Sequence, residues 1–296
     1  MASHDLVSRI RYESVPGFFI QSDPSTVPSP HPPAFGLKAC TSLTYWKDFE
    51  DRIGQLQQSA PRGTRYVVCW LGRHGQGWHN VAVDKHGPKA WDEYWSKQNG
   101  DNEITWGPDA RLTPLGESQA KAVNDLWKLE LSRPDDPVPL PTKMFTSPLA
   151  RALATAGITF KDIAILPRDK DMSHVTNPLV MEKLRESLAP YTSDKRSTKT
   201  EIQNLYPAFQ IEDEFSEVDE LWSETVSESG SHFNARVRAV LGNIMGNIVT
   251  KSDTFISITT HSGVAAEILR IINHRSYPLP AGGVIPVVIK VITQCQ

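Results

Sequence analysis

Short apolar runs that alternate with helix signals constrain the fold of this chain more than any other feature of its sequence. Residues 65–71 (RYVVCWL) form such a run, which ends at Gly72. Similar runs occupy residues 143–147, 254–260 and 284–292. Strands that alternate with helices are typical of a mostly parallel sheet covered on both faces. We therefore predict a three-layer α/β/α sandwich with a mostly parallel central sheet.

Helices are expected between and beside these strands. Thr113-Pro114 supplies an N-cap residue followed by proline at the first helical position, so a helix should run from there to about Leu131. Further helices are expected over residues 43–60, from about Leu149, and from about Gly263 to His274.

Other segments do not follow the alternation. Residues 1–60, with a proline-rich stretch at 15–36, are expected to form an extension packed on the core of a domain that spans residues 61–296. Residues 76–111 are rich in tryptophan, glycine and charge, and we interpret them as a long loop over one edge of the sheet. A polar segment at about 168–235 is expected to be a cap inserted between sheet strands.

Composition excludes several functional classes. The 296 residues carry a formal net charge of −3, which excludes a nucleic-acid binder that works by bulk positive charge. No apolar run approaches the roughly twenty residues of a membrane span, and the first residues lack the apolar stretch of a signal peptide. The cysteines, Cys40, Cys69 and Cys295, are odd in number and widely spaced, as expected for free thiols in a reducing compartment. We expect a cytoplasmic protein; its oligomeric state is not encoded in any of these features.

Histidine and arginine follow three of the predicted strands. Arg73-His74 lies between two glycines after the first strand, Arg151 lies in the first turn of a helix after the second, and His261 follows the third. A cation in the first helical turn opposes the helix dipole, so its presence at residue 151 favours a bound anion. Because the carboxyl ends of parallel strands meet at one edge of a sheet, these residues should share one site.

The motifs resemble the histidine phosphatase superfamily, the phosphoglycerate-mutase-like group. They occur in that family's order from residue 65 to residue 292: RHG at 73–75, an asparagine six residues after the histidine (Asn80), LTPLG at 112–116, SPLARA at 147–152 and the closing His261. The string RHGQGWHN resembles a fungal and plant branch of that family. The resemblance implies a phosphate ester as the small-molecule substrate, with no metal and no cofactor.

The resemblance also implies roles for individual residues. His74 would attack phosphorus and become phosphorylated, while Arg73, Arg151 and a protonated His261 would stabilise the charge on the phosphoryl oxygens. Asn80 would act as a neutral donor. Gln76 and Trp78, in the same segment, are expected to contact substrate.

A carboxylic acid is needed to protonate the leaving alkoxide. The family's acid is a glutamate in a cap segment, often preceded by leucine and one further residue. Leu184-Arg185-Glu186 fits that register, and Glu182, one helical turn earlier, is the competitor. We favour Glu186.

Several polar and aromatic residues have simpler interpretations. His79 is interpreted as a hydrogen-bonded loop residue, and the cluster Lys195, Arg196 and Lys199 as a solvated basic loop. The acidic run 212–224 is expected to form an exposed helix face. His86, His174, His232 and His274 lack motif context and should serve packing or the surface. Of Trp70, Trp78, Trp91, Trp95 and Trp106, most should pack in the core, with Trp78 the best pocket candidate.

Three functions remain open at this point. The leading one is a metal-independent phosphatase that works through phospho-His74. A phosphomutase would use the same residues but must exclude water, so a closed cap would favour it. A binding protein without catalysis would not need His74, Arg73, Arg151 and His261 together.

Overall fold

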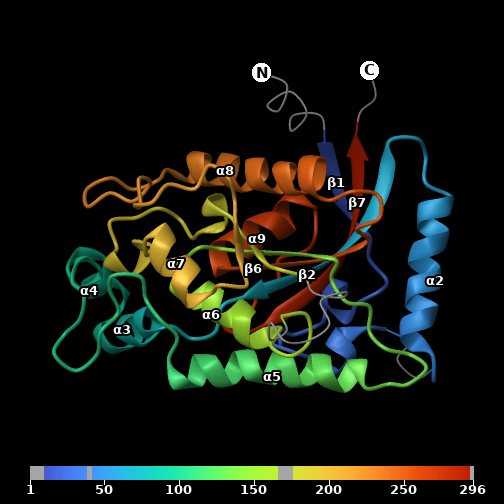
Figure 1. The fold of residues 1–296 in the computed structure, drawn as a ribbon, viewed down its shortest axis with the longest axis horizontal. Coiled ribbons are helices and arrows are strands. Elements are labelled where there is room, and N and C mark those ends of the chain that lie inside the picture. The colour runs from blue at the N-terminus through green and yellow to red at the C-terminus, as the bar shows by residue number, and fades with distance from the viewer. Residues whose placement is uncertain (1–9, 39–41, 166–175, 294–296) are drawn as a thin grey trace.

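The computed structural model describes residues 10–38, 42–165 and 176–293. These residues form a seven-stranded sheet with the strand order β1-β7-β2-β6-β3-β4-β5 (Figure 1). The strands are β1 (Ile10–Ser14), β2 (Thr64–Arg73), β3 (Lys143–Thr146), β4 (Leu179–Val180), β5 (Gln210–Ile211), β6 (Phe255–Thr260) and β7 (Val284–Thr293). Strands β2, β6, β3, β4 and β5 pair in parallel with one another, whereas β7 is antiparallel to both β2 and β1.

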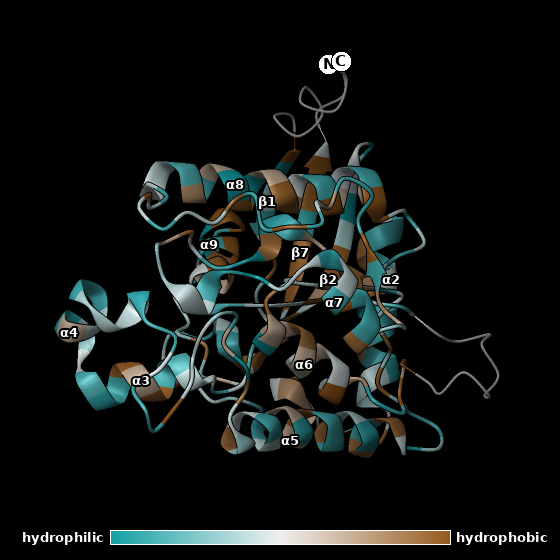
Figure 2. Ribbon diagram, turned by 60° about the vertical axis from the view of Figure 1, so that its left-hand side comes forward, coloured by the Kyte–Doolittle hydropathy of each residue, from teal (hydrophilic) through white to brown (hydrophobic). Residues whose placement is uncertain are grey.

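Two hydrophobic layers lie on opposite faces of the sheet. Strand β2 alternates, with Val67, Cys69 and Leu71 in one cluster and Val68 and Trp70 in the other, as its extended backbone requires. Helices α8 (Gly230–Asn243) and α9 (Ser262–Ile271) cover the first face, and α2 (Tyr45–Gln58) and α5 (Pro114–Leu131) cover the second. Figure 2 shows hydrophobic residues concentrated in the strands and hydrophilic and hydrophobic residues alternating along α5 and α8. The predicted α/β/α sandwich is confirmed.

Sheet register brings the predicted motifs to one edge. Arg73 lies opposite Thr260, and Thr146 lies opposite Thr259. The next residues along the chain, His74, Ser147 and His261, therefore leave the sheet together at the carboxyl ends of β2, β3 and β6. Helix α6 (Ala150–Thr159) begins immediately beyond β3, and α9 begins beyond β6.

Aromatic residues fix the N-terminal segment to the second face. Phe18, Phe19 and Phe35 are each at most 4% exposed and pack with Trp46 and Phe49 of α2. Edge-to-face contacts join Phe18 and Phe19 to Phe49, with ring centroids 5.5 Å and 5.3 Å apart. Burial of this amount of aromatic surface holds the proline-rich residues against the domain, where their regular structure is limited to the 3₁₀ turns η1 (Ile20–Ser22) and η2 (Pro33–Gly36).

The prediction of a long loop over residues 76–111 is wrong. This segment forms α3 (Trp78–His86), α4 (Pro88–Glu93) and the 3₁₀ turn η3 (Trp95–Lys97). Its tryptophans form a small separate core, built from Ala82, Trp91 and Trp106 with Trp78, Val83, Trp95 and Ile104 packed around them. The residues that suggested irregularity thus supply the apolar side chains that let short helices pack.

The acidic run 212–224 is not a helix face. It follows β5 as irregular chain, and its Asp219 carboxylate is turned inward to accept from Arg185. Regular structure in the predicted cap consists of β4, β5, α7 (Lys199–Leu205) and the 3₁₀ turns η5 (Glu182–Leu184) and η6 (Thr192–Asp194). Residues 168–175 of that cap, with His174, lie outside the described residues, as do Cys40 and Cys295. Cys69 is a buried free thiol.

No helix among the described residues is both long and apolar enough to cross a membrane.

Candidate active site

His74 is held at the end of β2 with one ring nitrogen free. Its Nδ1 lies 2.7 Å from the carbonyl oxygen of Gly75, which can only accept, so Nδ1 carries the proton. The Nε2 lone pair is therefore available to a substrate. Burial, together with Arg151 and Arg73, lowers the pKa of His74 well below 6.5, so the imidazole is neutral at pH 7. A neutral imidazole whose Nε2 lone pair has no hydrogen-bond partner is the nucleophilic form of histidine.

Three imidazoles share this site. The ring centroid of His74 lies 5.0 Å from that of His261 and 5.5 Å from that of His79. Burial and Arg151 lower the pKa values of His79 and His261 well below 6.5, as they do for His74. His79 was interpreted from the sequence as an ordinary loop histidine, and the structure instead places it beside His74. The available signal was its position in the first turn of α3, directly after the RHG segment.

Ser147 orients His261. The Ser147 hydroxyl lies 2.7 Å from His261 Nε2, and His261 Nδ1 is buried with no hydrogen-bond partner. Ser147 is the first residue of the SPLARA motif, and the register of β3 and β6 brings it to His261. No role could be predicted for this serine from the sequence alone, although it lies in one of the motifs that mark the site.

Arg151 and Arg73 each donate hydrogen bonds to acceptors of the protein itself. Arg151, 1% exposed, donates through Nη1 to the carbonyl of Ser193 at 2.8 Å and through Nη2 to the Asp194 carboxylate at 2.7 Å. Arg73 donates through Nη1 to the carbonyl of Leu279 at 2.9 Å. The sequence predicted that Arg151 binds an anion; in the structure the cap segment supplies acceptors for both of its terminal nitrogens.

Unpaired buried nitrogens gather around His74. Among the described residues, Nε of Arg73, Nε of Arg151, and Nδ1 of His79 and of His261 are buried without a partner. A buried polar group left unpaired costs about 1–3 kcal/mol, and more when it is charged. Several such groups around one histidine are explained by an anion with several acceptor oxygens, which would pair them together.

The two candidate acids lie in different surroundings. Glu186 Oε2 accepts from the backbone N–H of Gly263 at 3.0 Å, at the start of α9 and next to His261. Burial lowers the pKa of Arg73, and the nearby Glu186 carboxylate offsets part of that shift. Glu182 instead accepts from Arg185 at 2.9 Å and from Arg196 at 2.7 Å. Geometry therefore gives Glu186 access to the site and gives Glu182 a structural role.

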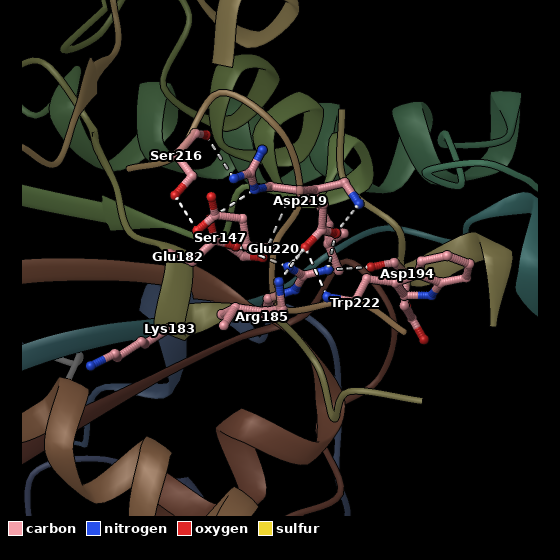
Figure 3. Close-up of polar contacts among 12 residues, drawn as sticks. Ser147, Glu182, Lys183, Arg185, Asp194, Ser216, Asp219, Glu220 and Trp222 are labelled. Carbon is pink, nitrogen blue, oxygen red and sulfur yellow. Dashed lines mark hydrogen bonds and ion pairs between the residues drawn. The ribbon is translucent and has the colours of Figure 1, made fainter. Parts of the chain in front are cut away.

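A buried ion-pair network underlies the site (Figure 3). Arg185, fully buried, donates to both Asp219 oxygens at 2.7 Å and to the backbone carbonyl of Asp194. Arg196 is 4% exposed and contacts Glu182 as well as carbonyls of the 216–218 segment. The interpretation of Lys195, Arg196 and Lys199 as a solvated basic loop is thus wrong for Arg196, because Glu182 compensates its charge inside the cap.

The other predicted contact residues have local roles. Asn80 Oδ1 accepts from the Gly77 N–H at 2.9 Å and so caps the start of α3. Gln76 accepts from the Thr113 hydroxyl at 2.9 Å through Oε1, which ties the segment after His74 to α5. Trp78 packs on the tryptophan cluster and lines a cavity of about 760 Å³ whose lining does not include His74.

Because His74, His79 and His261 are buried and neutral, the free energy of unfolding should depend on pH. Below 6.5 each imidazole takes up a proton in the unfolded chain but not in the folded one, so the free energy of unfolding decreases as the pH decreases. The three together should remove up to about 4 kcal/mol per pH unit. Urea denaturation at pH 7.5, 6.5 and 5.5 measures this, and H79Q should reduce the slope by about a third. A flat profile across that window would contradict the assignment of neutral rings.

Comparison with known proteins is consistent with this geometry. The family model of the histidine phosphatase superfamily (branch 1) matches residues 69–280. The chain belongs to the histidine phosphatase superfamily. The matched range begins within β2 and ends just before β7, so it contains each of the strand ends that carry the site.

Curated relatives of this chain are fungal and plant proteins. A "Probable phosphoglycerate mutase" of Arthroderma benhamiae is 40% identical over 99% of this chain and 88% of its own length. "Phosphomutase-like protein 3" of Candida albicans is 35% identical over 96% of this chain and 82% of its own. A "Phosphoglycerate mutase-like protein 1" of Arabidopsis thaliana is 29% identical over 72% of this chain and 74% of its own.

Within the ranges that the structure describes, no three His, Cys, Asp or Glu side chains are grouped so as to hold a metal ion.

Proposed function

We propose that this protein is a phosphatase that hydrolyses a small-molecule phosphate monoester through a phosphohistidine at His74, without a metal ion. The observation that carries the proposal is the free Nε2 lone pair of a buried neutral His74, surrounded by unpaired nitrogens of Arg73, Arg151, His79 and His261. A nucleophile inside a cluster of anion-binding groups suits phosphoryl transfer, in which positioning and electrostatic stabilisation supply most of the catalysis.

The reaction proceeds in two displacements. In the first, the lone pair of His74 Nε2 forms a bond to phosphorus, the bond from phosphorus to the ester oxygen breaks, and Glu186 gives that oxygen its proton. In the second, Glu186 takes a proton from water, the water oxygen bonds to phosphorus, and the bond to Nε2 breaks. The products are the alcohol and inorganic phosphate, and both His74 and Glu186 return to their starting states.

His261 enters this cycle neutral. Its lowered pKa differs from the protonated state expected from the family resemblance, because burial and Arg151 both disfavour a second positive charge in the empty site. A phosphate dianion within hydrogen-bond distance would raise that pKa, so the proton would arrive with the substrate.

Phosphate release tests the proposal. The protein is incubated with p-nitrophenyl phosphate and a panel of natural phosphate esters in the presence of EDTA, and inorganic phosphate is measured. Release that resists EDTA, together with a phosphoenzyme that is labile in acid and stable in base, would support the phosphohistidine route. No release from any ester by the folded protein would refute it.

A phosphomutase is the second candidate. It is favoured by the near-complete burial of His74 and His261, 2% and 0% exposed, because a closed site protects a phosphohistidine from water. The names of the fungal relatives point the same way. Product analysis separates the two: a mutase returns the phosphate to a hydroxyl of the substrate, whereas a phosphatase releases it to water.

Replacement of Glu186 and of Glu182 by glutamine should have different effects: the first on catalysis and the second on stability. E186Q should reduce kcat/KM for an alkyl phosphate by about 10²- to 10⁴-fold, and that for p-nitrophenyl phosphate much less, because p-nitrophenolate leaves without a proton. E182Q should lower stability, through Arg185 and Arg196, and leave this dependence on the leaving group intact. The reverse pattern in the two variants would assign the acid to Glu182.

A further inference from the structure

A largely apolar cavity adjoins the proposed phosphate site. It has a volume of about 670 Å³ and lies between α9 and residues 276–280, with Arg73, Ser262 and Gly263 at one end. Small-molecule sites usually measure about 300–1,000 Å³, so the cavity has the size for one. Its apolar walls are Ala266, Leu269, Tyr277, Pro278, Leu279 and Pro280, and Arg270, His274 and Ser276 also line it.

Two contacts connect the cavity to the reacting groups. Arg73 donates to the carbonyl of Leu279, a wall residue, at 2.9 Å. Gly263, another lining residue, donates its N–H to Glu186 at 3.0 Å. The cavity therefore starts where the proposed acid and one proposed phosphate ligand meet. Because the acid must lie beside the leaving oxygen, the organic group attached to that oxygen extends from this end.

We propose that this cavity binds the organic part of the substrate, and that the substrate is the monophosphate of an alcohol bearing a nonpolar ring. This inference rests on the proposed phosphatase function and deepens it. A wall of leucine, proline, alanine and a tyrosine ring gains free energy by covering apolar surface, about 25 cal/mol per Å² removed from water.

The polar groups of the cavity do not favour a sugar or glyceryl phosphate. No carboxylate is among its lining residues, so a polyhydroxylated group would find few acceptors for its hydroxyl protons. Arg270 is paired with Glu267 at 2.5 Å, and His274 Nδ1 lies 2.8 Å from the carbonyl of Arg275. His274 thus has a partner within the protein, and Arg270, whose side chain is 60% exposed, is neutralised by Glu267.

The larger cavity beside Trp78 is a poorer choice for this role. Its lining includes Asp109, Arg111, Glu117, Lys195 and Glu201, and it does not include Arg73, Ser262 or Gly263. The Asp109 carboxylate there is occupied by the N–H groups of Ala150 and Ser197, each at 2.8 Å. Its contacts therefore stabilise the junction of α6 with the cap.

Three alkyl esters of similar leaving-group basicity test the inference: 2-phenylethyl phosphate, ethyl phosphate and glycerol 3-phosphate. We expect kcat/KM for the phenylethyl ester to exceed that for each of the others by about 10- to 100-fold, the effect of burying one aromatic ring. A266W, which fills the cavity from an exposed position of α9, should reduce this ratio to about threefold or less. A235W, at an exposed position of α8, is the matched control and should keep the ratio.

A second variant and a second measurement keep the test decisive if A266W does not fold. A266E places a charge in the same cavity, and 2-phenylethanol should inhibit the wild-type protein competitively and A266E at least about tenfold more weakly. Equal kcat/KM for the phenylethyl and glyceryl esters, or a ratio unchanged by both variants at Ala266, would overturn the inference and leave the phosphatase proposal standing. Hydrolysis of none of the esters would instead overturn the phosphatase proposal.

Discussion

Replacement of His74 with asparagine is expected to reduce kcat/KM for phosphate ester hydrolysis by about 10⁴-fold or more, because it removes the atom that forms the bond to phosphorus. The ring of His74 makes its Nδ1 contact with Gly75 and packs against His79 and His261, so asparagine keeps a polar group near Gly75 but offers no nitrogen lone pair. Phosphate release measured at saturating and at low ester concentrations checks the effect on kcat and KM separately.

The control is H232N, at an exposed position of α8 and in none of the contacts of the site. It should release phosphate at the wild-type rate. The phosphoenzyme trapped by a rapid acid-free quench should be present in H232N and absent from H74N. A phosphoenzyme that persists in H74N would place the nucleophile elsewhere, with His79 as the nearest other imidazole.

Replacement of Arg185 with methionine should lower the free energy of unfolding by about 3–5 kcal/mol. Arg185 is fully buried, and its loss leaves the Asp219 carboxylate, 2% exposed, without its charge partner. The energy does not come from the ion pair being strong in itself. It comes from leaving an uncompensated charge in a place that water cannot reach.

Two further variants make the Arg185 measurement specific. K121M removes an exposed pair with Asp125 on α5 and should cost less than about 1 kcal/mol. R185M/D219L removes both partners and should be more stable than R185M alone, because no lone carboxylate remains. Urea denaturation of all three is the measurement. A cost for R185M no larger than that for K121M would mean that Asp219 finds another partner in the folded protein.

The strands and the motif positions could be read from the sequence because each depends on local patterns. RYVVCWL becomes the central part of β2, and Thr113 caps α5 by accepting from Gly116 at 3.0 Å. Parallel register then brings His74 and His261 side by side, as the strand-end argument predicted. These features need only periodicity, capping residues and the general geometry of an α/β sheet.

The buried ion pairs of the cap could not be predicted from the sequence in the same way. Arg185 and Asp219 lie 34 positions apart in chain with little regular structure, so no periodic pattern connects them. Arg196 and Glu182 are likewise brought together only by the path of irregular segments. The basic cluster and the acidic run each suggested solvent exposure, yet Arg196 is buried because Glu182 pairs with it, and the Asp219 side chain is buried because Arg185 pairs with it. The contact of Asp194 with Arg151 likewise depends on the path of irregular chain and could not be predicted from the sequence.

Strand β1 has a protective consequence for the folded protein. It has five residues and pairs with β7, a ten-residue strand that is mostly buried and rich in valine and isoleucine. Without β1, the outer hydrogen-bonding groups of β7 would be open to any other extended chain, and such an edge is a template for aggregation. Arg11 and Glu13 alternate along β1 as its exposed residues, so the edge that finally faces outward is short and charged. Cleavage after Ser14 is therefore expected to expose the β7 edge and to increase self-association through that strand.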